Sequence, residues 1–381
     1  MASNKTVMMI AGEASSDHYA GALAAALKQR DVSIEIIGMG GEEMRQSGVE
    51  ILQDIKGLDV MGFWDVLTRL RMFKRIFRNM VSVLEQRKPE AVILVDYPGF
   101  NIRFAKEAHK RGIRVIYFIS PKVWAWNRKR RDVIAANCDK MLVFFEFEID
   151  VYRETGLDTV CVGHPLAEEL EPYRSSKSRS KGQLGVPEDS LVIGLLPGSR
   201  KREIQRILPP MLDAAALLAQ KHEHIAFVCG CAPTFDEKML RSYLNNRHPE
   251  VKFIKGMTHD IMAASDACMV TSGTATLEAG IIGTPHVLCY KVGLMLYMIA
   301  SCLVKIPDIG IVNIASGKRV MPELVQYDMT PARITEEIER FLNDEAYAQN
   351  CKENLDNLYH QLKNDNVYEK AADEIFGMIN G

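Results

Sequence analysis

The most constraining feature of this sequence is a repeated alternation of short runs rich in β-branched residues with longer amphipathic segments. Each short run has the length of a strand and is followed by a turn signal and usually by a segment of helical periodicity. Such an alternation is typical of βαβ units, whose strands lie parallel in one sheet. The expected strands are 7–11, 34–37, 91–95, 113–119, 141–145 and 159–162 in the first half, and 191–195, 225–228, 251–254, 267–270 and 286–290 in the second.

The alternation stops and restarts around a polar stretch, residues 174–182, which has no apolar periodicity and is predicted to be a loop in or beside a linker. A chain of 381 residues also exceeds the usual size of a single hydrophobic core. We therefore expect two Rossmann-like α/β domains, residues 1–170 and 185–344. The last segment has a helical pattern, and helices within 345–381 are expected to complete the first domain.

Composition and charge exclude several classes of protein. Lys and Arg total 47 against 49 Asp and Glu, so the net charge of −2 gives no bulk positive field for nucleic acid. The eight cysteines form no C-x-x-C pair, and their apolar surroundings predict buried thiols in a reducing compartment. The longest uncharged apolar run, 293–304, is shorter than the roughly 20 residues of a spanning helix. With no signal-peptide pattern at the N-terminus, we expect a cytoplasmic protein without a transmembrane anchor.

Two turns in the first half carry carboxylates at the ends of expected strands. The segment Gly12-Glu-Ala-Ser-Ser-Asp17 follows the first strand and opens a helix, where free N–H groups favour an anion; a plain N-cap within the segment is the alternative. Asp96 follows strand 91–95, where open α/β sheets bind ligands, and is a candidate general base. Its alternative is a turn role, because Asp and Pro-Gly are common turn formers.

Two further segments of the first half resemble ligand-binding motifs. Residues 120–126 hold two of the three tryptophans at a strand end, where they would stack on sugars, cover acyl chains or pack in the core. The glycines of 38–41 follow the second strand and lack the third glycine of a dinucleotide fingerprint. No nicotinamide cofactor, and no cofactor of another kind, is therefore expected.

The second half contains two turns suited to phosphate. In Leu195-Leu-Pro-Gly-Ser-Arg-Lys-Arg-Glu203, Ser199 can cap the next helix and Arg200 offers a planar fork, while basic residues at a helix N-terminus oppose the dipole unless an anion binds there. In 271–278, hydroxyls and free N–H groups suit a phosphate, and Glu278 can accept hydrogen bonds from a ribose. A D-x-D motif is absent, so we expect no metal, and Arg, Lys and helix dipoles would neutralise a leaving diphosphate.

A basic amphipathic helix is predicted over 63–80. Its apolar stripe is wider than packing requires and its other face is strongly basic, which favours a membrane-surface or acyl-chain contact over a core-facing helix with a solvated back. The residues expected to make this contact are Trp64, Leu67, Leu70, Phe73 and Phe77 with Arg71, Lys74 and Arg75.

Together these motifs resemble one family over essentially the whole chain. The stretches that carry the resemblance are Gly12-Glu-Ala-Ser, Val60-Met-Gly62, Asp96-Tyr-Pro-Gly-Phe-Asn101, Ser120-Pro-Lys-Val-Trp-Ala-Trp126, Gly163-His164, Leu196-Pro-Gly-Ser-Arg200 and Thr271-Ser-Gly-Thr-Ala-Thr-Leu-Glu278. The chain resembles the lipid-A-disaccharide synthases, glycosyltransferases of Gram-negative lipid A assembly. Two departures are Ser16, where the family usually has Gly, and Gly99, where it often has an acidic residue.

The resemblance implies a GT-B architecture, in which two parallel sheets face across a cleft, and an inverting transfer. The donor would be UDP-2,3-diacylglucosamine, the acceptor 2,3-diacylglucosamine 1-phosphate, and the product a β-1,6-linked tetraacyl disaccharide 1-phosphate with UDP. It would work on the inner face of the cytoplasmic membrane, and we consider a homodimer. The residues assigned roles are Asp96 as base with Glu13 as its substitute, and Ser199, Arg200, Glu203, Ser272, Gly273, Thr274, Glu278 and, more weakly, Asn313 around the UDP-sugar.

Two other functions remain open at this point. One is another GT-B enzyme acting on unacylated sugars, such as a UDP-N-acetylglucosamine 2-epimerase, which the wide apolar-basic helix disfavours. The other is a nucleotide-sugar-binding membrane module without catalysis. Release of UDP, and its dependence on acyl chains and on Asp96, would separate the three.

Overall fold

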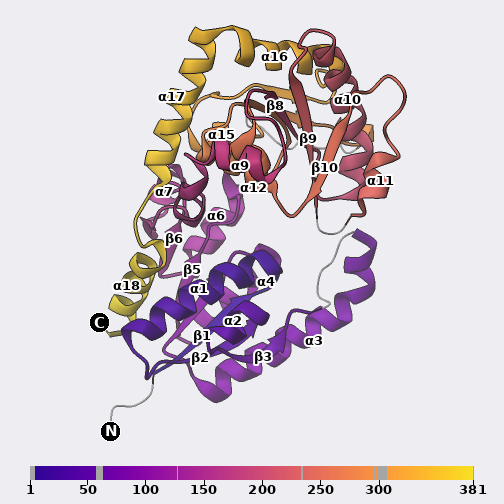
Figure 1. Cartoon of the computed structure of the whole chain (residues 1–381). Coiled ribbons are helices and arrows are strands. Elements are labelled where there is room, and N and C mark those ends of the chain that lie inside the picture. Colours follow the sequence, from indigo (N-terminus) through magenta and orange to yellow (C-terminus); the bar gives the residue numbers. More distant parts are fainter. Residues whose placement is uncertain are drawn as a thin grey trace. The chain divides into compact units, whose positions relative to one another are not determined.

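The computed structural model describes residues 5–56, 63–126, 128–232, 235–295, 297–298 and 307–380, without the side chains of 63–70, 125, 126 and 128. The chain forms two compact units, Met1–His164 with Asn364–Gly381, and Pro165–Lys363. Each unit contains its own all-parallel sheet flanked by helices (Figure 1). The prediction of two Rossmann-like α/β folds is confirmed.

The sheet of the first unit has seven strands in the order β3-β2-β1-β4-β5-β6-β7. The direction of the order reverses between β1 and β4, and ligands bind at the carboxyl ends of the strands at such a point. The inner strands are buried on both faces, which explains their nearly continuous apolar sequence, whereas the edge strands β3 and β7 are partly exposed. They are β1 (Thr6–Ala11), β2 (Glu35–Gly40), β3 (Glu50–Asp54), β4 (Ala91–Val95), β5 (Arg114–Phe118), β6 (Lys140–Val143) and β7 (Asp158–Cys161).

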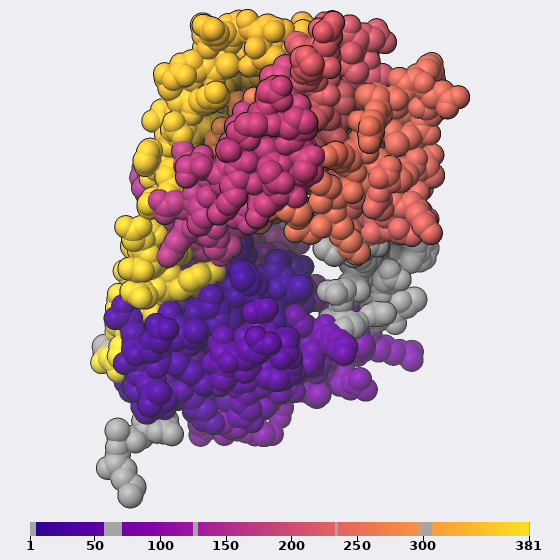
Figure 2. Space-filling view, in the orientation of Figure 1, coloured from indigo at the N-terminus to yellow at the C-terminus, as the bar shows by residue number. Residues whose placement is uncertain are grey.

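Helices cover both faces of this sheet. On one face α1 (Ala14–Arg30) packs with α18 (Val367–Asn380), which lies against the first unit (Figure 2, yellow against indigo). The apolar side chains of both helices belong to one core. On the other face lie α3 (Phe63–Arg87), α4 (Pro98–His109) and α6 (Arg128–Ala135), with the short helices α5 (Val123–Trp126) and α7 (Phe147–Arg153) nearby. None of the helices in the described ranges combines the length and the apolar composition needed to cross a bilayer.

The sheet of the second unit repeats the topology of the first. Its order is β10-β9-β8-β11-β12-β13, and the reversal falls between β8 and β11. The strands are β8 (Leu191–Leu196), β9 (Ile225–Cys231), β10 (Val251–Lys255), β11 (Ala267–Thr271), β12 (His286–Tyr290) and β13 (Glu323–Val325). Strands β13 and β3 were not among those expected from the sequence, because β13 has only three residues and three of the five residues of β3 are polar.

The helices of the second unit include one where a loop was expected. The polar stretch 174–182 is mostly α9 (Lys177–Gln183), which packs on α12 (Thr258–Ala264). Its apolar periodicity is missing because its buried residues are polar: Lys181 Nζ donates to the carbonyls of Glu188 and Ser190 at 2.8 and 2.9 Å. The other helices are α8 (Pro165–Glu169), η1 (Glu171–Tyr173), α10 (Lys201–Ala219), α11 (Glu237–Arg241), α13 (Thr274–Ile282), α15 (Ile311–Ala315), α16 (Pro331–Asn343) and α17 (Glu345–Leu362).

The C-terminal helices divide between the units, whereas both were expected to complete the first. Helix α17 belongs to the second unit, and its Leu355 and Leu358 lie close to Gly280 of α13. Arg174 fixes the same helix, since its guanidinium stacks on the Tyr359 ring at 3.9 Å and pairs with Asp356. Only α18 joins the first unit.

Candidate active site

Two carboxylates emerge side by side from the carboxyl edge of the first sheet. Ala11 of β1 is paired with Val95 of β4, so the turns that carry Glu13 and Asp96 leave neighbouring strands at the same level. Glu13 is exposed at the start of α1. Burial of the Asp96 side chain and the charge of Glu13 raise the pKa of Asp96 to about 6, against a smaller opposing effect of Lys122. A carboxylate of this pKa is suited to accept a proton near neutral pH.

The turn that presents Asp96 is strained and tightly held. Asp96 and Tyr97 both have left-handed backbones, with φ of 45° and 46°, which cost on the order of 1–3 kcal/mol each. Asn101 Nδ2 donates to the backbone carbonyls of Asp96 and Val95 at 2.8 and 3.2 Å, and the Tyr117 hydroxyl donates to the same Asp96 carbonyl at 2.7 Å. The sequence showed Asn101 in a motif but gave it no role, and it gave no signal for Tyr117.

The turn after β1 is closed on itself. The Ser16 hydroxyl accepts hydrogen bonds from the N–H groups of Gly12 and Glu13, at 3.1 and 3.0 Å, and donates to the Glu13 carbonyl. Gly12 is needed for packing, because a Cβ atom there would lie 2.0 Å from the Tyr97 ring. Glu13 is the N-cap of α1 and Ser16 the third residue of the helix, so the segment has the cap role, while an anion site at the first N–H groups of α1 stays a prediction.

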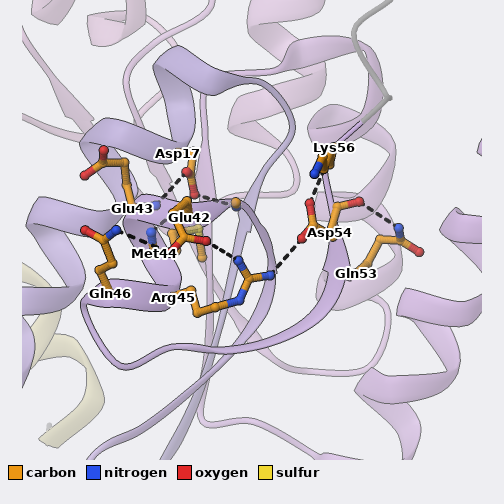
Figure 3. Close-up of polar contacts among 10 residues, drawn as sticks. Asp17, Glu42, Glu43, Met44, Arg45, Gln46, Gln53, Asp54 and Lys56 are labelled. Atoms are coloured by element: carbon orange, nitrogen blue, oxygen red, sulfur yellow. Dashed lines mark hydrogen bonds and ion pairs between the residues drawn. The ribbon is translucent and has the colours of Figure 1, made fainter.

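Asp17 has a structural role in the first unit, where it links α1 to the start of α2 (Glu42–Gln46). Its carboxylate accepts hydrogen bonds from the N–H groups of Gly41, Glu43 and Met44 at 2.6, 3.0 and 3.4 Å, and so caps α2 from α1 (Figure 3). A Cβ atom on Gly41 would lie 2.7 Å from the Asp17 carboxylate. The glycines of 38–41 thus serve close packing.

A further buried carboxyl lies at the ends of β5 and β6. The chain turns out of β5 at Ile119, whose φ is 72°, and the Ser120 hydroxyl lies 3.0 Å from the Tyr152 hydroxyl. Burial raises the pKa of the Glu148 carboxyl to about 8, so it is largely protonated at neutral pH. The Trp124 ring packs edge-on against Phe147 at 5.4 Å, and the side chain of Trp126 lies outside the described residues. No sequence signal pointed to Glu148.

In the second unit, Arg200 stands at the carboxyl edge, at the start of α10. Gly198 makes the turn with φ of 109°, and the Arg200 side chain is 73% exposed. Glu203 Oε1 lies 2.8 Å from Arg200 Nη1, and Glu203 Oε2 accepts a hydrogen bond from the Arg200 N–H at 3.3 Å. The structure thus places Glu203 on Arg200, with Ser199 exposed beside it.

The neighbouring turn carries the N-terminus of α13. Val270 of β11 is paired with Leu196 of β8, so the turns 197–200 and 272–274 leave adjacent strands. Gly273, the N-cap, has no side chain to accept hydrogen bonds from the first N–H groups of α13, and Gly273 and Thr274 are exposed. Glu278 lies on the same helix, 3.3 Å from His259 Nε2, a partner that the sequence did not indicate.

Asn313 is buried and fully bonded within the second unit. Its Nδ2 donates to Met321 O at 2.9 Å and to Glu323 Oε1 at 2.7 Å, while Oδ1 accepts from the N–H groups of Val320 and Met321. Glu323 in turn accepts from the N–H groups of Ile309 and Gly310, both at 2.9 Å. The amide therefore fixes the segment 309–323.

The basic face of α3 is exposed where the structure describes it. Arg71, Lys74 and Arg75 point to solvent and Phe73 is half-buried. Phe77 instead packs edge-on against Phe100 and Phe104, at 5.3 and 6.0 Å, in the core. The motif 60–62 and the side chains of Trp64, Leu67 and Leu70 lie outside the described residues.

Comparison with known proteins gives matches over the whole chain. A family model described as lipid-A-disaccharide synthetase matches residues 7–375. The chain is 38% identical to the lipid-A-disaccharide synthase of Syntrophus aciditrophicus, covering 97% of this chain and 96% of that protein. It is 36% identical to the enzyme of the same name from Myxococcus xanthus, covering 98% and 97%.

Solved structures share the fold at much lower identity. The S. aureus MnaA–UDP structure matches with a TM-score of 0.65 at 12% identity, covering 99% of this chain and 97% of that one. CalG4, a calicheamicin glycosyltransferase, matches with a TM-score of 0.58 at 15% identity, covering 100% and 99%. These likenesses show the architecture and leave the chemistry to the residues at the two carboxyl edges.

Proposed function

The chain belongs to the lipid-A-disaccharide synthase family, and on that premise we propose that Asp96 is the base of its reaction and Arg200 the clamp on its leaving group. Family membership makes it a glycosyltransferase of lipid A biosynthesis with a GT-B fold, and a UDP-sugar is its substrate. The proposed donor is UDP-2,3-diacylglucosamine, and the proposed acceptor is 2,3-diacylglucosamine 1-phosphate.

The second unit is proposed to hold the UDP of the donor. Arg200, kept in place by Glu203, would direct its planar fork at the diphosphate, and Ser199 lies beside it. Ser272, Gly273 and Thr274 would contribute hydroxyls and the N–H groups of α13, which favour negative charge. Glu278 would accept hydrogen bonds from the ribose. Asn313 would act indirectly, by fixing the segment 309–323.

The first unit is proposed to supply the base. The ionised Asp96 takes the proton of the acceptor's 6-hydroxyl while that oxygen forms a bond to the anomeric carbon. The bond from that carbon to the UDP oxygen breaks, and the charge that develops on UDP is stabilised at Arg200 and α13. Attack opposite the leaving group converts the α-linked donor into a β-linked product. Glu13 favours this step, because its charge raises the proton affinity of Asp96.

A membrane-surface role is proposed for α3. Arg71, Lys74 and Arg75 line its exposed face beside Phe73, a combination suited to anionic headgroups and the acyl boundary. This contact would place the enzyme on the inner face of the cytoplasmic membrane, where both acylated substrates would be found.

The observation that carries the proposal is the raised pKa of Asp96 at the reversal point of the first sheet. The experiment is UDP release from purified protein given detergent-dispersed diacylated donor and acceptor, beside unacylated UDP-N-acetylglucosamine. We expect release only with both lipids, and a disaccharide mass in the product. Epimerisation of the unacylated sugar would make the protein an epimerase, and tight UDP-sugar binding without release would make it a binding module.

A further inference from the structure

The second unit carries an exposed apolar cluster that the site above does not use. Seven large apolar side chains are exposed among the described residues, and four of them are Leu294, Met295, Met298 and Tyr327. Met295 is 74% exposed and Tyr327 70%. We call these four residues the 294–327 patch. Single exposed apolar residues need no explanation, whereas a cluster marks an interaction surface.

The patch is bordered by cations. Lys291 precedes it, and Arg206 of α10 lies beside it, since a Cβ atom on Gly293 would be 3.3 Å from Arg206 Nη2. Neither cation forms an ion pair with a carboxylate in the ranges that the structure covers; residues 291–298 contain no acidic residue, and one exposed carboxylate, Asp328, adjoins Tyr327. Tyr297 packs edge-on against Tyr327, with ring centroids 6.0 Å apart. Apolar side chains, tyrosines and unpaired cations together match the chemistry of a membrane interface.

The backbone fixes where this patch lies. It begins directly after β12, which pairs with β11, so it leaves the same edge of the sheet as the 272–274 turn. Gln326 holds its base: Gln326 Oε1 accepts from the Val292 N–H at 3.1 Å, and Gln326 Nε2 donates to the Val292 carbonyl at 3.2 Å. The exposed side chains thus project from an anchored strand end.

We propose that the 294–327 patch is a second membrane contact, which binds the surface of an anionic lipid bilayer. This proposal depends on the proposed function in one respect only, namely that the UDP-sugar donor carries acyl chains and is met at a membrane. A bilayer suits the patch better than a second copy of this chain, because a twofold contact centred on it would bring two sets of Arg206 and Lys291 together. Each unit would then carry its own lipid contact, α3 in the first and this patch in the second.

The direct test is fluorescence quenching of the full chain on vesicles of phosphatidylglycerol and phosphatidylcholine with brominated acyl chains. Met295→Trp adds a reporter in the patch, and Val32→Trp adds one at an apolar residue that is 90% exposed in the first unit. After subtraction of the native tryptophans, we expect quenching of the Met295→Trp signal and none of the Val32→Trp signal. An unquenched reporter at 295 on protein that sediments with the vesicles would overturn the proposal.

Vesicle sedimentation supplies the second measurement. The triple variant Leu294→Ser, Met295→Ser, Met298→Ser should lower the partition coefficient on anionic vesicles on the order of tenfold, and Val32→Ser should not change it. Unchanged partition with a halved mass by light scattering would identify a second copy as the occupant and reject the bilayer. Neither assay involves turnover, so a wild-type chain that releases no UDP would reject the proposed function and leave this proposal standing.

Discussion

The carboxyl edges of the two sheets share one topology and differ in chemistry. At the first edge, the N–H groups after β1 are bonded to Ser16, and the groups presented are carboxylates, with Asp96 held on a left-handed turn. At the second edge, the N-terminus of α13 is exposed and Arg200 extends into solvent. The first edge is thus equipped to remove a proton and the second to hold an anion.

The difference teaches that the topology provides a position and the turn residues provide the chemistry. Both reversal points place turns from adjacent strands side by side. At the first, the N-cap is Glu13, whose carboxylate adds negative charge to the start of α1. At the second, the N-cap is Gly273, which has no side chain to accept from the first N–H groups of α13.

The strongest test of this contrast is Asp96→Asn. Loss of the base should lower kcat for UDP release by about 10³-fold. The variant should also be more stable at pH 8, on the order of 2 kcal/mol, because the pKa of Asp96 rises from 3.8 to about 6 on folding. The sign follows from proton binding: the folded state holds this proton more tightly, so stability is lost as pH rises from about 4 to 6. Chemical unfolding of the wild type and the variant at about pH 4 and at pH 8 checks the difference in stability. A variant that keeps its kcat would remove Asp96 from the base role.

The matching test at the second edge is Arg200→Ala. Without the fork on the diphosphate, kcat/KM should fall by about 10²-fold while the melting temperature stays close to that of the wild type, since the side chain is exposed. Lys201→Ala, one residue further along α10, is the matched control and should change little. Equal losses in the two variants would mean that net charge acts at this edge, and not a directed hydrogen-bond pair.

A third test asks whether the first edge depends on packing. Gly12→Ala should destabilise the protein by about 2 kcal/mol, because the Tyr97 ring occupies the place of the new methyl group. Gly99→Ala, two residues after Tyr97 in the first turn of α4, has open space around it and should be nearly neutral. Chemical unfolding of both variants compares them, and equal stabilities would show that the Tyr97 ring moves aside freely.

The smallest expected effect concerns the two carboxylates of the first edge. Glu13→Gln removes a charge that raises the pKa of Asp96, so the acid limb of the kcat/KM profile should move to lower pH. The profile should be measured from pH 4.5 to 8 with the same detergent-dispersed substrates. A limb that stays in place would show that burial alone sets the pKa of Asp96.

The sequence predicted the fold better than it predicted the roles of single residues. Apolar runs bounded by turns identified both sheets, because strands buried on two faces leave a strong pattern. Strand β3 was missed because three of its five residues are polar, and β13 because it has only three residues. The structure places the turns of Glu13 and Asp96 at one carboxyl edge and those of Arg200 and Thr274 at the other, and the roles of these residues stay predictions. Side-chain partners could not be predicted, since Tyr117, Glu148 and His259 meet their neighbours only through tertiary packing.

Helix α18 gives the first unit an unusual order of synthesis. Its residues leave the ribosome after every residue of the second unit, yet Val367 and Ile375 pack in the same core as Leu23 and Leu27 of α1. At about 5–20 residues per second, the apolar face of α1 stays uncovered for roughly 10–40 seconds while the second unit is made. The nascent first unit therefore cannot complete this core until the last residues of the chain have been made.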